Sequence, residues 1–173
     1  MTGRGGTGGR ANYDMHRTDQ RAWREADAPL SPLGKQFLAY WRGKCPPGGG
    51  FPARADIVPD EMLRLLPYIF MVDVLPDAPG GPDFRFRLVG TAIVEIEGEH
   101  TGRLLSAMFP DRDAYAVLWR QYRDAAAGKV WVRQETLRWQ GRDHVHYEVI
   151  LAPLQDEAGR VTMLIGLAHA PER

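Results

Sequence analysis

Apolar side chains recur at helical spacing in two parts of the chain. The first part lies between residues 33 and 41, where the apolar positions fall on one stripe, at Leu33, Phe37, Tyr40 and Trp41. Ser31 precedes this stripe as a candidate N-cap, and Pro32 suits the first position of a helix. The pattern therefore predicts a helix that starts at Pro32 and buries one face against an apolar surface.

The second helical pattern, from Asp111 to Ala127, is the clearest in the chain. Its apolar face is mostly aromatic and consists of Tyr115, Leu118, Trp119, Tyr122 and Ala125. Aspartates in the first turn and Gly128 after the last turn are typical of helix ends. Shorter helices are predicted after Pro59 and over residues 91–97. The aromatic face of the long helix needs an apolar partner.

Alternating patterns and turn residues predict five strands, at Tyr68–Leu75, Phe84–Val89, Val130–Trp139, Asp143–Leu154 and Val161–His169. The first two strands form an antiparallel pair, and the last three form a meander. The resulting order is a helix, two strands, several helices and three strands. That order indicates an α+β fold in which the helices are segregated from one antiparallel sheet.

The stretch RFRLVGTAIVEIEGEHTG, residues 85–102, changes from strand to helix at Gly90. A phosphate-binding loop needs glycines in a pattern such as G-x-G-x-x-G, so that several backbone N–H groups converge at a helix start. The stretch lacks that pattern. An N-cap at Gly90 or Thr91 and a helix stop at Gly98 account for this corner without a ligand.

Residues 1–30 are rich in glycine and charge and poor in apolar side chains, so we expect a disordered N-terminal tail followed by a single domain over residues 31–173. The arginine-glycine steps of the tail are compatible with RNA contact. The segment is short and unrepeated, however, which favours an inert terminus.

Charge and cysteine content narrow the class of partner. Lysine plus arginine number 22 and aspartate plus glutamate number 22, so no overall field draws the chain to nucleic acid or an anionic membrane. The lone Cys45 excludes an intramolecular disulfide and fits a reducing compartment. No apolar run approaches the roughly 20 residues of a membrane span. We therefore expect a cytoplasmic protein that binds neither nucleic acid nor a membrane.

Together with the order of elements, three stretches of the sequence resemble a PAS domain: DFRFRLVGT, EHTGRLLSAMF and APLQDEAGRVTMLIGLAH. More specifically, the chain is similar to an alphaproteobacterial PAS-like family once catalogued as a domain of unknown function. In that family a tryptophan-bearing helix and a P-x-R-x-D-x-x-P segment precede the sheet, which correspond here to Trp41 and residues 52–59. The resemblance covers Leu33 to about Ala170.

The resemblance implies a five-stranded sheet in spatial order 2-1-5-4-3, with helices over one face. The helix that carries Trp41 is then the expected cover of the other face. The resemblance also implies a role in sensing or protein interaction. It implies no reaction, because a fold does not fix a function.

Two PAS cofactors are not expected. Haem-binding PAS domains generally place an axial histidine on the long helix, and light-sensing ones place a reactive cysteine near the helix after the second strand. Residues 111–127 contain no histidine, and Cys45 lies upstream of the first strand. Formal haem ligands are His100, Met108, Tyr115 and Tyr122. The polar neighbours of His100 favour an exposed turn and not a haem ligand. Neither haem nor a photoreactive flavin is therefore expected. An unidentified small molecule is compatible with the sequence.

A ligand pocket is predicted on the inner face of the sheet. If the last hairpin pairs residues 154 and 161, small and large side chains face one another there. The candidate lining residues are Ile93, Ile96, Trp119, Tyr122, Tyr147, Val149, Leu164 and Gly166. The same residues also suit a dry, interdigitated core, so the sequence leaves both readings open. The opposite side of the last strand is also apolar, which predicts a sheet covered on both faces.

Three histidines and two carboxylates are candidates for chemistry. In the register above, His146 lies opposite His169, and His144 lies one step diagonal. Three imidazoles in this arrangement would suit zinc. Solvated histidines are the favoured reading, because nothing in the sequence specifies a second shell. Glu135 opposes Glu148 if the preceding hairpin has a two-residue turn, and such a pair can act as acid and base. Neutralisation by Arg133 is the preferred reading of that pair.

Two arginines, Arg87 and Arg103, match an anionic ligand. Pairing with Asp73 or Glu95 is the preferred reading of these arginines. The sequence also lacks G-x-S-x-G, C-x-x-C and H-E-x-x-H, so a hydrolase or metalloprotease has no local support.

The sequence thus favours a non-catalytic PAS-like sensory or regulatory module that acts through a small ligand, protein contact or both. Its output passes to a separate signalling protein or through a homodimer formed by the N-terminal helix. The alternative is a small α+β enzyme, an isomerase or hydrolase, that uses a cavity carboxylate such as Glu148; a strongly raised carboxyl pKa in a closed pocket would favour it.

Overall fold

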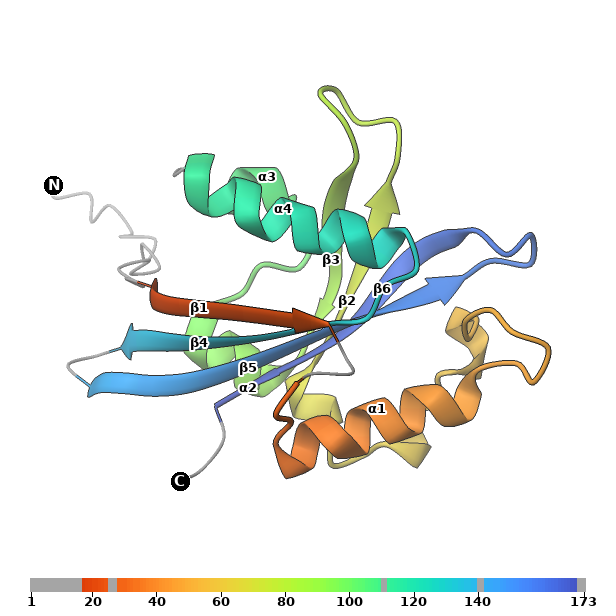
Figure 1. Cartoon of the computed structure of the whole chain (residues 1–173), viewed down its shortest axis with the longest axis horizontal. Coiled ribbons are helices and arrows are strands. Elements are labelled where there is room, and N and C mark those ends of the chain that lie inside the picture. Colours follow the sequence, from red (N-terminus) through yellow and green to blue (C-terminus); the bar gives the residue numbers. More distant parts are fainter. Residues whose placement is uncertain (1–16, 25–27, 110–111, 140–141, 171–173) are drawn as a thin grey trace, which may run out of the picture.

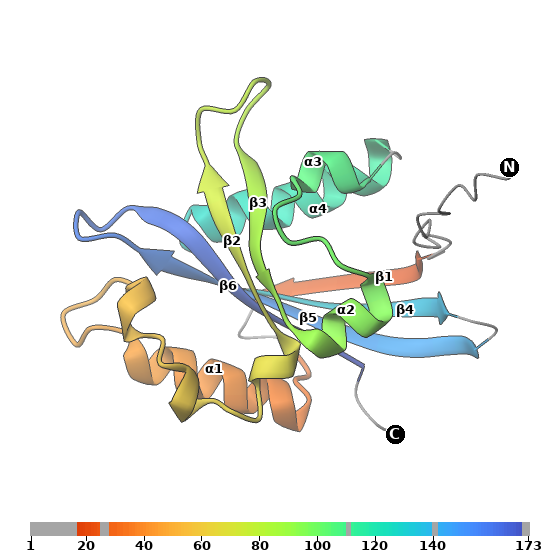
Figure 2. The same cartoon turned by 180° about the vertical axis from the view of Figure 1, so that it is seen from behind.

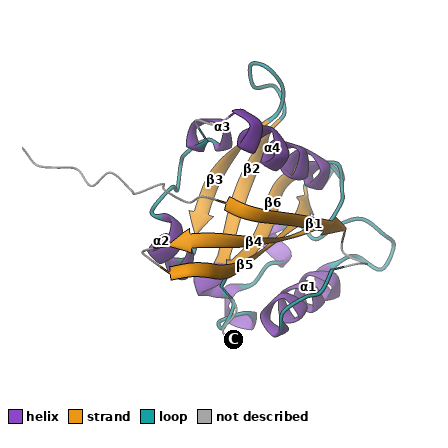
Figure 3. Cartoon of the chain, turned by 60° about the vertical axis from the view of Figure 1, so that its left-hand side comes forward, coloured by secondary structure: helices purple, strands orange, loops and turns teal. Residues whose placement is uncertain are grey.

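The structure is a computed structural model, and it describes residues 17–24, 28–109, 112–139 and 142–170. Its centre is an antiparallel sheet of six strands in the order β1-β4-β5-β6-β2-β3 (Figure 1). The strands are β1 (Arg17–Arg24), β2 (Ile69–Leu75), β3 (Asp83–Val89), β4 (Trp131–Trp139), β5 (Arg142–Gln155) and β6 (Val161–His169). The sheet is strongly twisted, so that β1, β4 and β5 cross the direction of β2 and β3 in Figure 3.

Helices cover both faces of this sheet. On one face lie α2 (Thr91–Glu97), α3 (Leu105–Met108) and α4 (Arg112–Ala126), and on the other lies α1 (Pro32–Lys44), as Figures 1 and 2 show. Three short 3₁₀ turns join α1 to the sheet: η2 (Arg54–Asp56), η3 (Pro59–Glu61) and η4 (Leu66–Tyr68). The predicted α+β fold and its strand order 2-1-5-4-3 are confirmed, since β2 to β6 are the five predicted strands in that spatial order.

The sixth strand, β1, corrects the prediction that residues 1–30 form a disordered tail. It pairs antiparallel with β4, for example Gln20 with Glu135 and Trp23 with Val132. The edge of β4 would otherwise present a row of unpaired N–H and C=O groups. Because any backbone can satisfy such groups, a polar segment forms this strand without the alternating pattern that strand prediction needs. Residues 1–16 and 25–27 lie outside the described residues.

Each face of the sheet has its own hydrophobic core. On the α1 face, Phe37, Leu38 and Trp41 pack with side chains of β5 and β6, such as Ile150 and Leu167. The indole N–H of Trp41 donates to the carbonyl of Pro153 at 3.0 Å, which satisfies the one polar atom of that buried side chain. As predicted, α1 therefore covers the outer face of the sheet, and it does so within its own chain.

The core on the other face is formed by β2, β3, β5 and β6 with α2, α3 and α4. Its buried members include Phe84, Phe86, Ile93, Tyr122 and Leu164. Aromatic rings pack against one another in this core. The ring centroid of Tyr122 lies 5.2 Å from that of Phe84 and 6.4 Å from that of Phe86. Of the face predicted for residues 111–127, Leu118, Tyr122 and Ala125 are thus buried, whereas Tyr115 and Trp119 are half-buried.

The last hairpin is offset by two residues from the predicted register. Val149 lies opposite Ala168, and Glu148 lies opposite His169. Val161 pairs with Gln155 and not with Leu154, which accounts for one residue of the offset, and an irregularity between Leu154 and Gln155 accounts for the other. An offset of two keeps the faces of Val149 and Ala168 as predicted. The irregularity itself moves Val161 to the α4 face, whereas the prediction placed it on the α1 face.

Gly90 is required by a close approach of two backbone segments. A Cβ atom on this glycine would lie 2.3 Å from the carbonyl oxygen of Pro67, and Gly90 N–H donates to Ile69 O at 2.8 Å. The residue precedes α2 as its N-cap without a side-chain cap, and Gly98 ends the helix with a φ of 85°. The corner therefore has a structural explanation, as the sequence predicted.

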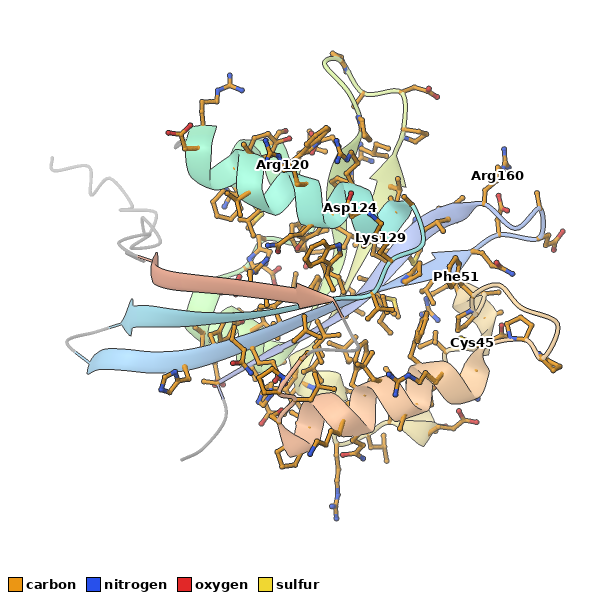
Figure 4. The ribbon with its side chains drawn as sticks, in the orientation of Figure 1. Cys45, Phe51, Arg120, Asp124, Lys129 and Arg160 are labelled. Carbon is orange, nitrogen blue, oxygen red and sulfur yellow. The ribbon has the colours of Figure 1, made fainter. Side chains whose placement is uncertain are left out.

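Phe51 links the two layers beyond the ends of the strands. Its ring stacks on Trp41 with a centroid distance of 6.2 Å, and a Cβ on Gly128, which follows α4, would lie 2.9 Å from the same ring. In Figure 4, Phe51 and Cys45 lie near the C-terminal end of α1, while Asp124 and Lys129 mark the end of α4. The loop after α1 therefore contributes to both layers of the fold.

Gly166 offers a test of the inner core. A Cβ at this position would lie 2.1 Å from the ring of Phe70, so the space that the sequence assigned to a ligand is filled by that ring. We predict that Gly166→Ala lowers the free energy of unfolding by about 1–3 kcal/mol, because the buried ring must move. Urea unfolding measures the change. Gly43→Ala in α1, where nothing lies within 4 Å, is the matched control and should stabilise or be neutral; equal effects of the two changes would contradict the packing described.

Candidate functional site

The candidate site is a small cavity between the sheet and the α2–α4 layer. Its volume is about 30 Å³, enough for one or two water molecules. The lining residues are Phe70, Phe86, Ile93, Glu97, His100, Leu105, Met108, Phe109, Leu118, Tyr122, Arg133, Val149 and Ala168. The lining is mostly apolar and aromatic with a few polar groups, which is the composition typical of small-molecule sites.

Five strands supply one wall of the cavity and the α2–α4 layer supplies the other. Phe70 and Phe86 come from the neighbouring strands β2 and β3, with ring centroids 6.0 Å apart. Arg133, Val149 and Ala168 come from β4, β5 and β6, where Arg133 pairs with Val149 and Val149 pairs with Ala168. Because these three residues are direct neighbours across the sheet, they form one continuous row in the wall.

The polar groups of the lining are His100, Glu97 and Arg133. His100 is 2% exposed, and its ring meets that of Phe86 edge-on at 4.8 Å. Its Nδ1 lies 2.8 Å from Gly98 O, which accepts a hydrogen bond if that nitrogen carries the proton, and its Nε2 lies 3.8 Å from Glu97 Oε2. The imidazole therefore has one nitrogen held by the backbone and the other near a carboxylate.

Arg133 brings a buried positive charge to the same cavity. It is 6% exposed, and its Nη1 donates to Gln121 Oε1 of α4 at 2.9 Å. A buried guanidinium needs hydrogen-bond acceptors, and its planar donors match carboxylate and other oxygen-rich groups. Arg133 is thus the side chain of the lining best suited to orient a polar group of a ligand.

The buried position of His100 corrects the expectation of an exposed turn. Glu99 and Thr101 are polar and exposed as the sequence indicates, and Glu99 Oε1 accepts from Thr101 N–H at 2.7 Å. The turn between Gly98 and Gly102, which both have positive φ, directs the intervening His100 inward. The prediction that His100 is exposed was wrong because it rested on the polar residues beside it. The two flanking glycines were the sequence signal for a tight turn.

Of the eight predicted lining residues, Ile93, Tyr122 and Val149 line the cavity. Ile96, Tyr147 and Leu164 belong to or pack against the same core without reaching it. Trp119 instead fastens the loop between β2 and β3 to α4, because its indole N–H donates to Pro82 O at 2.7 Å and Arg123 lies over its ring at 5.1 Å. Gly166 is covered by Phe70.

Most of the cavity-lining residues outside the predicted set could not be found from the sequence, for two reasons. Leu105, Met108 and Phe109 come from α3 and its end, a helix too short to show a periodic pattern. Arg133 and Ala168 are the direct neighbours of Val149, whereas the predicted register placed Ala168 opposite Tyr147 on the same face. The alternation of Phe84 and Phe86 in the second strand did indicate which side of that strand is buried.

The histidine register that was weighed as a zinc site, with His146 opposite His169, does not form. His169 lies opposite Glu148, whereas His146 lies opposite Thr136 and is exposed. Within the part of the chain that the structure describes, no three His, Cys, Asp or Glu side chains are placed to hold a metal ion. The side chain of His144 lies outside the described residues.

Glu148 instead binds the start of α1 on the opposite face of the sheet from the cavity. Its Oε2 accepts from Ser31 N–H at 3.0 Å, and its Oε1 accepts from Ser31 Oγ–H at 2.7 Å. Ser31 Oγ in turn accepts from Gly34 N–H at 3.0 Å as the N-cap of α1, which confirms the predicted cap. Nε2 of His169 lies 2.9 Å from Ser31 Oγ and 3.2 Å from Glu148 Oε1.

These contacts hold Glu148 in its charged form. Burial raises the pKa of this carboxyl, but the hydrogen bonds from His169 and Ser31 outweigh burial, so the pKa of Glu148 lies below its ordinary value. The positive end of the α1 dipole acts in the same direction. An acid–base role in the cavity would need Glu148 on the cavity face of the sheet and with a raised pKa, whereas it lies on the α1 face and its pKa is lowered.

The predicted carboxylate pair is also wrong by one residue. Glu135 lies opposite Tyr147, and Gln134 lies opposite Glu148. The hairpin pairs Trp139 with Arg142, two residues from the assumed register, and the irregularity between Leu137 and Trp139 restores one of these two residues. Arg133 faces the cavity and α4, so it does not neutralise Glu148. The expected pairing of Arg87 with Asp73 is confirmed, because Arg87 Nε donates to Asp73 Oδ1 at 2.8 Å. This contact is an ordinary ion pair at the surface.

The sheet order, its two-sided cover and the cavity beneath the α2–α4 layer define a PAS-like sensory fold. A family model described as "PAS domain" matches residues 30–169, so the chain belongs to the PAS domain family. PAS domains are sensory and regulatory modules, as the sequence resemblance implied.

Other comparisons add little to the family assignment. No curated protein matches the chain. A solved structure described as an RNA-binding light-oxygen-voltage receptor has a TM-score of 0.48 and 18% sequence identity, over 88% of this chain and 38% of that one. The chain thus spans well under half of the receptor chain, and a likeness at this level carries no functional argument. In the described ranges no helix is both long enough and apolar enough to span a membrane.

Glu148 generates a prediction about acid stability. A group whose pKa is lowered by folding contributes stability above its unfolded-state pKa, about 4.3 for glutamate, and loses it as the pH falls through the folded-state pKa. We predict that Glu148→Gln removes part of the acid-induced loss of stability below about pH 5 and costs about 1–3 kcal/mol at pH 7.

Urea unfolding of both proteins across that pH range measures these differences. Glu157→Gln, an exposed carboxyl in the β5–β6 loop, is the matched control and should leave the pH profile unchanged. An unchanged profile in Glu148→Gln would contradict the contacts described for Glu148.

Proposed function

We propose that this PAS domain is a non-catalytic cytoplasmic sensory module that binds a small molecule in the cavity beneath α2–α4. The observation that carries the proposal is the convergence of His100, Glu97 and Arg133, two of them nearly inaccessible to solvent, on an otherwise aromatic and apolar cavity. A few fixed polar groups in an otherwise apolar pocket orient a bound molecule, so their gathering at one cavity favours a ligand with a polar group.

The ligand combines an apolar body with an oxygen-rich group. Rings such as Phe70 and Phe86 suit the apolar part, and the guanidinium of Arg133 suits the oxygen atoms. The cavity of about 30 Å³ has to widen to hold such a molecule. Residues 97–109 supply the movable part of the wall in this proposal, because they consist of a glycine-bounded turn and the four-residue helix α3.

The alternative proposal, a small isomerase or hydrolase that uses Glu148, has less support. Glu148 lies on the α1 face, it is tied to Ser31 and His169, and its pKa is lowered rather than raised. Glu97 is the carboxylate that lines the cavity. An enzyme hypothesis would therefore have to rest on Glu97 with His100 as its partner.

Output passes to a separate signalling protein or through self-association. A homodimer through α1 was suggested by its apolar stripe, but Phe37 and Trp41 pack on the sheet of the same chain. Such a dimer therefore uses the outer face of α1, which exposes Lys35, Gln36 and Arg42. The molecular mass in solution, measured by light scattering, distinguishes this route from a separate partner.

Ligand binding is tested by thermal shift with a library of small metabolites. A ligand that binds only the folded protein stabilises it by roughly 2.7 kcal/mol at a hundredfold excess over its dissociation constant. We predict that at least one metabolite with a carboxylate or similar group raises the melting temperature, and that Arg133→Met reduces this rise to near zero. Arg87→Met, which removes an exposed arginine paired with Asp73, should leave it intact. An equal rise in both variants would contradict the role of Arg133.

We further predict that the purified protein carries neither haem nor a photoreactive flavin. Nδ1 of His100 lies at hydrogen-bond distance from Gly98 O, Nε2 lies near Glu97, and the cavity is far smaller than a haem group. The absorption spectrum of protein expressed with a haem precursor measures this, and we expect no Soret or flavin band. An intense Soret band that disappears in His100→Ala would show that the prediction is wrong.

A further inference from the structure

The cavity lining carries side chains of both charges. Among the lining residues that the structure describes, Glu97 is the acidic one and Arg133 is the basic one, and the other ionisable side chains are His100 and Tyr122. A site that presents one negative and one positive group favours a ligand that carries the two opposite charges. The lining therefore points to more than the carboxylate that Arg133 alone would select.

The two charged groups lie at different depths. The side chain of Glu97, at the end of α2, is 17% exposed, so its carboxylate lies near the mouth of the cavity. Arg133, on β4, is nearly inaccessible to solvent, and its Nη1 donates to the amide oxygen of Gln121 on α4. The negative group thus marks the outer end of the site and the positive group marks the inner end.

At the outer end, Glu97 and His100 place two hydrogen-bond acceptors side by side. Nδ1 of His100 lies 2.8 Å from Gly98 O, which can only accept, so Nδ1 carries the proton and Nε2 of the neutral ring is an acceptor. Nε2 lies 3.8 Å from Glu97 Oε2, which is longer than the usual hydrogen bond of about 2.7–3.2 Å. A donor nitrogen between these two atoms can reach both. The carboxylate charge favours an ammonium group in that place.

At the inner end, Arg133 has the opposite preference. A guanidinium has only donors, and their planar arrangement matches a carboxylate. A ligand with two carboxylates fits less well, because its second carboxylate would lie near Glu97, and like charges at close range are costly in a site of low polarity. The two ends together therefore favour a zwitterion over a dicarboxylate.

The size of the cavity limits the distance between the two charges of the ligand. Its volume is about 30 Å³, so Glu97, His100 and Arg133 surround a space no larger than one or two water molecules. The ammonium and carboxylate groups of the ligand must then be close together, as they are when both are attached to one carbon atom. The rings of Phe70 and Phe86 leave an apolar environment for the rest of the molecule.

We propose that the cavity binds an α-amino acid with an apolar side chain, whose ammonium group is held by Glu97 and His100 and whose carboxylate is held by Arg133. This assignment rests on the proposed function, because it names the class of ligand for the same cavity. Binding changes no covalent bond of the ligand.

The experiment compares matched ligands by titration calorimetry on the full chain. L-Leucine is compared with isocaproate, which lacks the ammonium group, with isoamylamine, which lacks the carboxylate, and with ε-aminocaproate, an isomer of leucine whose two charges lie at opposite ends. L-Phenylalanine, phenylpropanoate and phenylethylamine repeat the comparison with an aromatic side chain. We expect at least one of the two amino acids to bind about tenfold or more tightly than each of its counterparts, because every counterpart loses a charge-assisted hydrogen bond.

Two variants connect each preference to its residue. We expect Glu97→Gln to reduce the preference for the amino acid over the acid without an ammonium group to near one. Arg133→Met should do the same for the preference over the amine. The matched control is Glu95→Gln, an exposed glutamate on the same helix, which should leave both preferences unchanged. The comparison of ligands on the wild-type protein stands without any variant.

Equal or tighter binding of isocaproate or ε-aminocaproate than of leucine, with the same result in the aromatic series, would overturn the proposal. A preference for the amino acid that survives Glu97→Gln would also overturn it. Tight binding of isocaproate would leave the proposed function intact, because a carboxylate ligand would still bind in the cavity. If no compound of either series binds, the amino-acid assignment is wrong, and the metabolite library decides separately whether the cavity binds another molecule.

Discussion

The fold depends on the fact that the central strands β5 and β6 are apolar on both faces. Ile150 and Leu167 face α1, whereas Val149 and Leu164 face the α2–α4 layer. A sheet with two apolar faces has to be covered twice, because either face left open would expose a large hydrophobic surface. The helix α1, between β1 and β2, covers one face, and the helices α2, α3 and α4, between β3 and β4, cover the other. The chain therefore has two cores that share their strands.

Buried polar groups lie on both faces of this two-sided sheet. On the α1 face, the carboxylate of Glu148 is 1% exposed and is satisfied by Ser31 and His169. On the cavity face, Arg133 is held by Gln121 and lies in the same lining as His100. Each burial costs free energy that an apolar residue would avoid, so polar residues at these positions favour a specific arrangement over maximum stability. The functional proposals follow from this placement.

Much of the architecture could be predicted from the sequence, because periodic apolar patterns with caps and turn residues mark the elements. The five strands, α1, α2 and α4 lie where these patterns place them. The strand β1 could not be predicted, since it is held by backbone pairing that leaves no side-chain signal. The site was harder still. The positions of His169 and Ala168 depended on a ladder irregularity near Gln155, and the inward turn of His100 depended on the conformations of Gly98 and Gly102. Such features are decided by backbone geometry rather than by the hydrophobic pattern.

The proposed binding of a small molecule in the cavity beneath α2–α4 is open to a direct measurement. Native mass spectrometry of the protein purified from its own host provides it, because an endogenous ligand is then available during folding. We expect a folded species heavier than the polypeptide by the mass of one small molecule per chain, which separates on denaturation and is not retained by Arg133→Met. A folded wild-type protein that has only the polypeptide mass under every growth condition tested would contradict it.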